Sequence, residues 1–151
     1  MPRVALGLGA NLGDRAAALR RAVEIIQSDP AVDVVSVSTI IETDPVGGPE
    51  QPDYLNAVMV IETTLPPDAV LALAHRAEQD AGRVREVRWG PRTLDVDVLA
   101  YDDVESDDPV LTLPHPRALE REFVLAPWAE VDPEFVVKGR SVADWLSRLA
   151  T

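Results

Sequence analysis

The stretch RWGPRTLDVDVLAYD, residues 88–102, decides the fold that we predict for this chain. Gly90-Pro91 ends whatever precedes it, and the aliphatic and β-branched residues that follow predict a strand over 93–101. Side chains two residues apart on a strand share one face and lie about 7 Å apart, because the rise is roughly 3.3 Å per residue. Asp95 and Asp97 therefore project together from one face, and the aliphatic residues that alternate with them form core on the other face.

Two carboxylates on one strand face repel each other, so the pair needs water, cations or guanidinium groups to compensate its charge. Mg²⁺ prefers a few carboxylates together with water and phosphate oxygens as ligands. Arg88 and Arg92 flank the pair, and guanidinium groups bind phosphate oxygens in bidentate fashion. We interpret the segment as a metal-phosphate site. The alternative is that the two acids form the solvated polar face of an edge strand.

Length, charge and composition limit the classes of protein to which this chain can belong. With 151 residues the chain is long enough for one core, so we expect a single domain over 1–151. The formal net charge of −12 argues against nucleic-acid binding, which needs clustered cations. Cysteine is absent, no apolar run approaches the roughly 18 residues that cross a bilayer, and no export signal is apparent. We therefore expect a cytoplasmic protein without membrane partners.

The local charge differs from the overall charge. Residues 76–92 carry five arginines against three acidic residues. A basic segment within an acidic chain suits a small polyanion rather than a duplex. Because Lys138 is the only lysine, a coding bias toward arginine is the alternative explanation.

Two nucleotide-binding motifs are not supported by the sequence. Gly7, Gly9 and Gly13 do not fit G-x-G-x-x-G, because Leu12 occupies the third glycine position, and no G-x-x-x-x-G-K-[ST] occurs. These mismatches leave no case for a dinucleotide-binding fold or a P-loop.

Three polar side chains lie within otherwise apolar elements. Asn56 points inward on a predicted strand, and such an amide needs polar partners, either in the neighbouring backbone or in a ligand. His75 and Glu78 share one side of a predicted helix. Metal ligation by that pair competes with the simpler interpretation that both face solvent, which we favour.

The order of elements predicts a ferredoxin-like α+β fold, βαββαβ, with an antiparallel sheet and both helices on one face. Asp14 is the expected cap of the first helix, and residues 43–54 are either a binding loop or a mobile connection. Residues 102–151 form a C-terminal αβ extension, with a weak helix over 117–130 interrupted at Pro127 and a short helix capped by Ser141. The predicted strands are 3–8, 32–41, 55–63 and 93–101, and the predicted helices are 15–28 and 68–81.

Four separated motifs carry a resemblance to a known family. They are GANLGD (9–14), ETDPVGGPEQPDYLNAV (42–58), RWGPRTLDVDVL (88–99), and LTLPHPR (111–117) followed by EREFVLAPW (120–128). In this order and spacing the chain resembles the 6-hydroxymethyl-7,8-dihydropterin pyrophosphokinases of the folate pathway, over about residues 4–130. The resemblance implies a monomer whose partners are ATP and 6-hydroxymethyl-7,8-dihydropterin. It implies transfer of the β,γ-diphosphate of ATP to the pterin hydroxymethyl oxygen, with release of AMP.

The resemblance also implies roles for individual residues. Asp95 and Asp97 would hold two Mg²⁺ ions with the nucleotide, and Arg83 and Arg92 would act with them in catalysis. The ATP-binding positions would be His75, Glu78, Arg83, Arg85, Trp89, Arg92, Val98, Thr112, His115 and Arg121. The pterin-binding positions would be Thr43, Asp44, Pro45, Val46, Tyr54, Asn56, Trp89, Arg92, Asp95 and Phe123.

Two other functional classes stay open from the residues alone. A two-metal phosphodiesterase or nuclease also uses paired acids, although the net charge of −12 counts against a nuclease. A small-ligand regulatory module of the ACT type shares the βαββαβ order but needs no paired acids beside five arginines. The chain departs from the resembled family at Val110, at Pro116, and at His75, where glutamine is expected.

Overall fold

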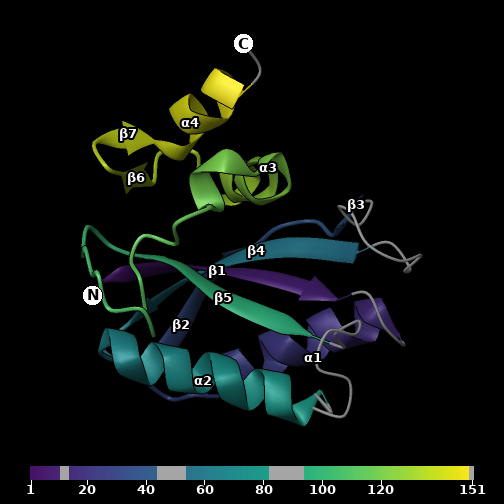
Figure 1. The fold of residues 1–151 in the computed structure, drawn as a ribbon. Coiled ribbons are helices and arrows are strands. Elements are labelled where there is room, and N and C mark those ends of the chain that lie inside the picture. The colour runs from purple at the N-terminus through teal and green to yellow at the C-terminus, as the bar shows by residue number, and fades with distance from the viewer. Residues whose placement is uncertain (11–13, 44–53, 82–93, 150–151) are drawn as a thin grey trace.

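The computed structural model of the protein describes residues 1–10, 14–43, 54–81 and 94–149 (Figure 1). Its strands and helices alternate along the first two thirds of the chain, and short elements follow. They are β1 (Arg3–Ala10), α1 (Arg15–Gln27), β2 (Val32–Val37), β3 (Ile41–Thr43), β4 (Tyr54–Thr63), α2 (Pro67–Asp80), β5 (Asp95–Tyr101), the 3₁₀ helix η1 (Ala118–Glu120), α3 (Glu122–Val131), β6 (Val136–Val137), β7 (Arg140–Ser141) and α4 (Val142–Leu149).

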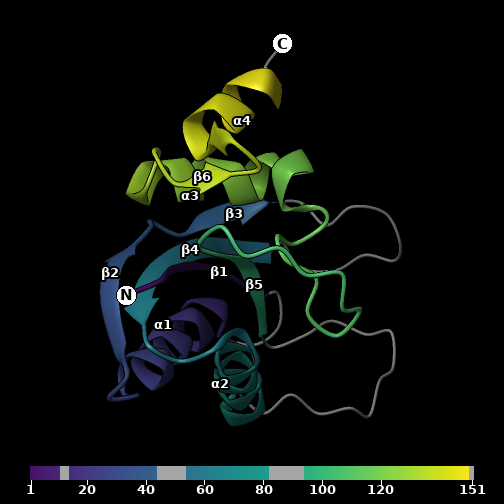
Figure 2. The same ribbon diagram turned by 90° about the vertical axis from the view of Figure 1, so that its left-hand side faces the viewer.

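One antiparallel sheet forms the middle layer of the molecule. Its strand order is β2-β4-β1-β5, and β3 also pairs with β4. Helices α1 and α2 cover one face of this sheet, whereas α3 lies over the other face with the β6–β7 hairpin and α4 beyond it (Figures 1 and 2). This is the ferredoxin-like arrangement that the sequence predicts, with the C-terminal extension as a third layer.

Both faces of the sheet are therefore buried. On the α1/α2 face, the aliphatic residues of alternate positions in β1, β4 and β5 pack with Leu19, Ile26 and Leu73. On the other face, Val58 and Val60 pack with the extension, whose Trp128 is completely buried and meets Phe135 edge to face, with ring centroids 5.3 Å apart. The extension is thus part of the core and closes the sheet, which the sequence motifs alone do not predict.

The strand predicted over 32–41 is two strands in the structure. Ser38 interrupts it: its Oγ accepts a hydrogen bond from the N–H of Val58 at 2.9 Å, and its own N–H donates to the Val58 carbonyl at 2.9 Å. Because the hydroxyl replaces a main-chain carbonyl as the acceptor, the chain leaves the regular ladder after β2 and rejoins β4 as β3.

The prediction that Pro127 interrupts the helix over 117–130 is wrong. The helical segment breaks instead at Arg121, whose extended backbone (φ −114°, ψ 113°) separates η1 from α3. Pro127 lies inside α3 and is buried beside Leu125 and Trp128. An interior proline removes one backbone donor and crowds the carbonyl four residues earlier, and burial of Pro127 with its apolar neighbours offsets that cost.

The two capping predictions are confirmed. Asp14 Oδ1 accepts a hydrogen bond from the N–H of Ala17 at 3.1 Å, and Ser141 Oγ accepts one from the N–H of Asp144 at 3.1 Å. Such bonds satisfy donors that the first turn of a helix leaves unpaired. Among the helices that the structure describes, none is long and apolar enough to span a membrane.

Candidate active site

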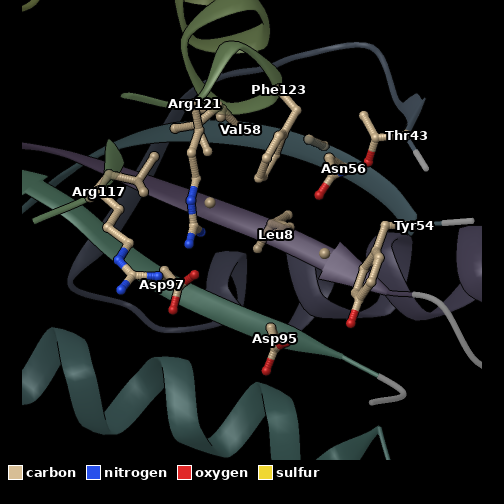
Figure 3. Close-up of a pocket in the computed structure, with 15 residues that line it drawn as sticks. Leu8, Thr43, Tyr54, Asn56, Val58, Asp95, Asp97, Arg117, Arg121 and Phe123 are labelled. Carbon is tan, nitrogen blue, oxygen red and sulfur yellow. Dashed lines mark hydrogen bonds between the residues drawn. The ribbon is translucent and has the colours of Figure 1, made fainter. Parts of the chain in front are cut away.

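Asp95 and Asp97 lie on the face of β5 that the strand period predicts. In the register with β1, Asp95 is opposite Gly9 and Asp97 is opposite Gly7. The glycines present no side chain toward the acids, so both carboxylates extend from the sheet into one cavity (Figure 3). Asp95 is half-buried and Asp97 is exposed, which leaves both accessible to a ligand.

That cavity measures about 530 Å³ and lies between the sheet and the segment that precedes and begins α3. This volume is within the range of sites that hold a small-molecule substrate. The sheet supplies its floor from β1, β4 and β5, and the 117–124 segment supplies its opposite wall. Its lining residues are Gly7, Leu8, Gly9, Thr43, Tyr54, Asn56, Ala57, Val58, Asp95, Asp97, Leu99, Arg117, Arg121, Phe123 and Val124.

One end of the cavity is built from aromatic rings and an amide. Tyr54 begins β4, Phe123 lies in the first turn of α3, and Asn56 lies between them (Figure 3). The side chain of Asn56 is buried, and its Nδ2 donates a hydrogen bond to Thr43 Oγ1 at 2.6 Å. Aromatic faces beside an oriented amide suit a flat heterocycle with donors and acceptors on its edge.

Two arginines line the other side of the cavity. Arg117 and Arg121 extend from the segment above the sheet toward the side where Asp97 lies (Figure 3). The Arg121 guanidinium carbon is 5.6 Å from the centroid of the Phe123 ring, which is a cation–π distance. The two guanidinium groups can bind phosphate oxygens, and a metal ion on the two carboxylates would bind them from the opposite side.

His115, two residues before Arg117, has a defined tautomer. Its backbone N–H donates to the Leu99 carbonyl at 2.8 Å, and its Nδ1 accepts from the N–H of Arg117 at 3.3 Å. Because Nδ1 is an acceptor, a neutral imidazole carries its proton on Nε2. Burial lowers the pKa of His115 and is the largest cause; Asp97 opposes this shift, and Arg121 and Arg117 add to it.

Five of the predicted ATP-binding side chains within the described ranges are not among those that line the cavity: His115, described above, and four others. His75 is exposed on α2, and Val98 is buried in the core beneath β5. Glu78 is also buried, and its Oε2 accepts a hydrogen bond from the N–H of Val96 at 2.9 Å, so it does not face solvent as we favoured. Thr112 Oγ1 donates to the Asp108 carbonyl at 3.0 Å.

Several predicted site residues lie outside the residues that the structure describes. They are Asp44, Pro45, Val46, Arg83, Arg85, Arg88, Trp89 and Arg92. The predicted residues that the structure does bring together are Asp95, Asp97, Thr43, Tyr54, Asn56, Arg121 and Phe123.

Sequence reasoning missed part of this cavity. Arg117 closes the LTLPHPR motif two residues after His115, and that position is the signal that would have found it. Gly7 and Gly9 share a face of β1 with period two, but they were considered only as a dinucleotide-binding pattern. Val58 and Val124 carried no signal, because only the packing of α3 on β4 makes them part of a wall.

The two carboxylates fit Mg²⁺ that arrives with a nucleotide. In the described part of the chain, no cluster of three or more His, Cys, Asp or Glu side chains is arranged to hold a metal ion. Mg²⁺ is commonly bound by one or two carboxylates, with water and substrate phosphates completing its six ligands. Asp95 and Asp97 are such a set, and the arginines opposite them would face the phosphates.

Comparisons with known proteins show the family of this chain. A family model described as 7,8-dihydro-6-hydroxymethylpterin-pyrophosphokinase (HPPK) matches residues 5–133. The chain belongs to the HPPK family. A 2-amino-4-hydroxy-6-hydroxymethyldihydropteridine pyrophosphokinase of Methylorubrum extorquens is 45% identical over 149 residues, which cover 99% of this chain and 94% of that HPPK. The enzyme of the same name from Bacillus subtilis is 48% identical over 126 residues, covering 83% of this chain and 75% of the relative.

Solved HPPK structures share the fold. A crystal structure of an HPPK-DHPS in complex with substrates matches 98% of this chain with a TM-score of 0.73 at 11% identity. A wild-type HPPK-DHPS of Plasmodium falciparum matches with a TM-score of 0.69 at 10% identity. The chain spans 45% and 43% of those two solved chains. The family that the four motifs predict is thereby confirmed, and so is its fold.

Proposed function

We propose that this chain transfers the β,γ-diphosphate of ATP to the hydroxymethyl oxygen of 6-hydroxymethyl-7,8-dihydropterin and releases AMP, in folate biosynthesis. One observation carries the proposal: a single cavity joins paired carboxylates, two guanidinium groups and an aromatic-amide wall (Figure 3). These are the groups needed by a metal, a polyphosphate and a flat polar heterocycle. Membership of the HPPK family supports the same reaction.

We propose that the pterin binds at the aromatic end of the cavity. Tyr54 and Phe123 bound the space for the ring, and Asn56 faces its polar edge. Asp95 lies across β1 from Asn56, so a ring held by the amide directs its hydroxymethyl group toward the carboxylates. Holding both reactants in one orientation supplies much of the catalysis in phosphoryl transfer.

Asp95 and Asp97 are proposed to hold two Mg²⁺ ions between them and the triphosphate. When bound, Mg²⁺ neutralises charge on the phosphates and makes a coordinated hydroxyl more acidic. The two carboxylates fix where that charge compensation occurs. Their separation along the strand, about 7 Å at the Cα positions, allows each to contribute to a different ion.

The cations are proposed to bind the phosphate oxygens. Arg117 and Arg121 line the described cavity, and His115, whose Nδ1 accepts from the N–H of Arg117, keeps an Nε2–H donor. Arg83, Arg85, Arg92 and Trp89 remain assigned to ATP and to closure over the substrates by resemblance. The same holds for His75, Glu78, Val98 and Thr112 at the nucleotide, and for Asp44, Pro45 and Val46 at the pterin.

We further propose that the protein acts as a monomer in the cytoplasm on these two small molecules. The net charge of −12 supports the exclusion of nucleic acid as a partner, because phosphate backbones bind clustered cations.

The test is an incubation of the protein with MgATP and 6-hydroxymethyl-7,8-dihydropterin, followed by separation of the nucleotides. Pterin-dependent AMP that disappears when a chelator removes Mg²⁺ is the expected result. ADP in place of AMP would mean transfer of a single phosphoryl group. Absence of nucleotide turnover would overturn the proposal in favour of a binding module.

A further inference from the structure

Three residues on neighbouring strands form a row across the floor of the cavity. Gly9 of β1 is opposite Asn56 on β4 and opposite Asp95 on β5. The outer two carry polar side chains into the cavity, and the middle one carries none. Since neighbouring strands lie about 4.8 Å apart, the Cα positions of Asn56 and Asp95 are roughly 10 Å apart, and Gly9 between them adds no side chain.

A side chain at position 9 would crowd the amide of Asn56. A Cβ at Gly9 would lie 3.3 Å from Asn56 Oδ1, closer than ordinary van der Waals contact. The same measurement shows that Oδ1, and not Nδ2, is the amide atom above Gly9. The cavity therefore presents an acceptor from Asn56 at this point, as Figure 3 shows for the oxygen of that side chain.

The orientation of the amide is set from the opposite side by Thr43. Asn56 Nδ2 donates to Thr43 Oγ1 at 2.6 Å, and the residue is buried, so the amide has little room to rotate. The bond to Thr43 thus holds the amide in place with Oδ1, an acceptor, toward the cavity.

We infer that Thr43, through its hydroxyl, and Gly9, through its missing side chain, are positioning residues for Asn56 that select heterocycles with an N–H donor at this edge. The inference rests on the proposed pterin site and assigns neither residue a part in the chemical step. It predicts that changes at either position raise the KM for the pterin and leave the KM for ATP unchanged.

The experiment compares Thr43→Val with Thr43→Ser in the AMP-forming assay. Valine keeps the shape and loses the hydroxyl, whereas serine keeps the hydroxyl. We expect Thr43→Val to raise the pterin KM about fivefold to tenfold, the effect of one hydrogen bond, and Thr43→Ser to stay within about twofold of wild type. Thr39→Val is the matched control, because it removes a threonine hydroxyl that bonds to Glu130 and does not line the cavity.

A Gly9→Ala variant tests the same inference from the other side. The amide of Asn56 is held between Gly9 and Thr43, so the added methyl must push it out of its present position, and we expect a rise in pterin KM of about tenfold or more. The thermal midpoint of each variant is measured in parallel. If the variant at position 9 unfolds below the assay temperature, the variants at position 43 carry the test, and the reverse holds if a variant at position 43 unfolds.

The outcomes separate this inference from the proposed function. Wild-type protein without pterin-dependent AMP overturns the proposed function, and the inference with it. Active wild-type protein with Thr43→Val equal to wild type overturns only the inference. So does an equal rise in pterin KM for Thr43→Val and Thr43→Ser, or a rise in the ATP KM of the same size as that for the pterin.

Discussion

At the scale of single residues, a substitution of Asp97 tests whether the protein is a metal-dependent enzyme or a module that only binds a ligand. Its carboxylate is exposed and opposite Gly7, so its removal leaves the core intact. We expect Asp97→Ala to lower the turnover number about 100-fold or more while the thermal midpoint stays close to wild type. The AMP assay measures the first quantity. Asp103→Ala, an exposed acid just beyond β5, is the control, and near-full turnover in Asp97→Ala would contradict the metal role.

Arg117 allows a second prediction at this scale. Because it lines the cavity from above the sheet and is exposed, its loss should weaken phosphate binding without disturbing the fold. We expect Arg117→Ala to raise the KM for ATP about fivefold to tenfold, with a smaller effect of Arg117→Lys, which keeps the charge but not the bidentate geometry. Arg20→Ala on α1 is the control. Equal KM values for ATP in Arg117→Ala and wild type would remove this residue from the site.

The burial of His115 makes a prediction about pH. The folded protein holds the pKa of His115 below its ordinary value of 6.5, to which it returns on unfolding. As pH falls through this window, the unfolded chain binds a proton that the folded chain does not, so acid favours unfolding. We expect wild type to lose more stability below about pH 6.5 than His115→Asn. Urea midpoints over a pH series measure this, and parallel curves for the two proteins would contradict it.

At the scale of elements, a hydrogen bond joins α2 to the start of β5. Glu78 of α2 accepts the N–H of Val96, between the two acids, from the far side of the sheet. Glu78→Ala leaves a buried N–H without this acceptor and should lower the free energy of unfolding by about 1–3 kcal/mol. Glu78→Gln, which keeps a carbonyl oxygen, should lower it less. Urea unfolding gives both values, and an equal loss in the two variants would argue against the bond.

The Glu78→Gln variant also tests whether Glu78 only anchors β5 or contacts ATP as well. If it only anchors β5, Glu78→Gln should keep the ATP KM of wild type while both substrates still turn over. If it also contacts ATP, as the family resemblance implies, the ATP KM should rise in Glu78→Gln at temperatures where the variant is fully folded. Periodicity alone could not decide this, because the helical face of a residue says nothing about which strand packs against it.

At the scale of the whole molecule, α3 is part of the third layer, and its first turn helps to form the wall of the cavity opposite the sheet. Trp128 of α3 is completely buried, and in the described part of the chain its Nε1 has no hydrogen-bond partner. We expect Trp128→Ala to cost about 3–5 kcal/mol of unfolding free energy. Trp128→Phe should cost less than half of that, because it keeps most of the apolar contact and removes a donor that is not satisfied. Urea unfolding of both variants is the measurement, and equal costs would contradict it.

The sequence by itself determined those features that depend on residues close together along the chain. The shared face of Asp95 and Asp97 follows from the strand period, and the helix starts at Asp14 and Ser141 follow from local capping chemistry. The order of elements and the four motifs were also sufficient for the fold and the family.

Only the tertiary structure decided which side chains meet across the layers. It brought Arg117 into the same cavity as Asp97, turned Glu78 toward β5, placed Gly9 between Asn56 and Asp95, and packed the C-terminal extension into a second core on the sheet. The physical reason is the separation along the chain of the residues that interact. A cap or a strand period involves residues a few positions apart, whereas these contacts join segments that come together only when packed layers exclude water between them.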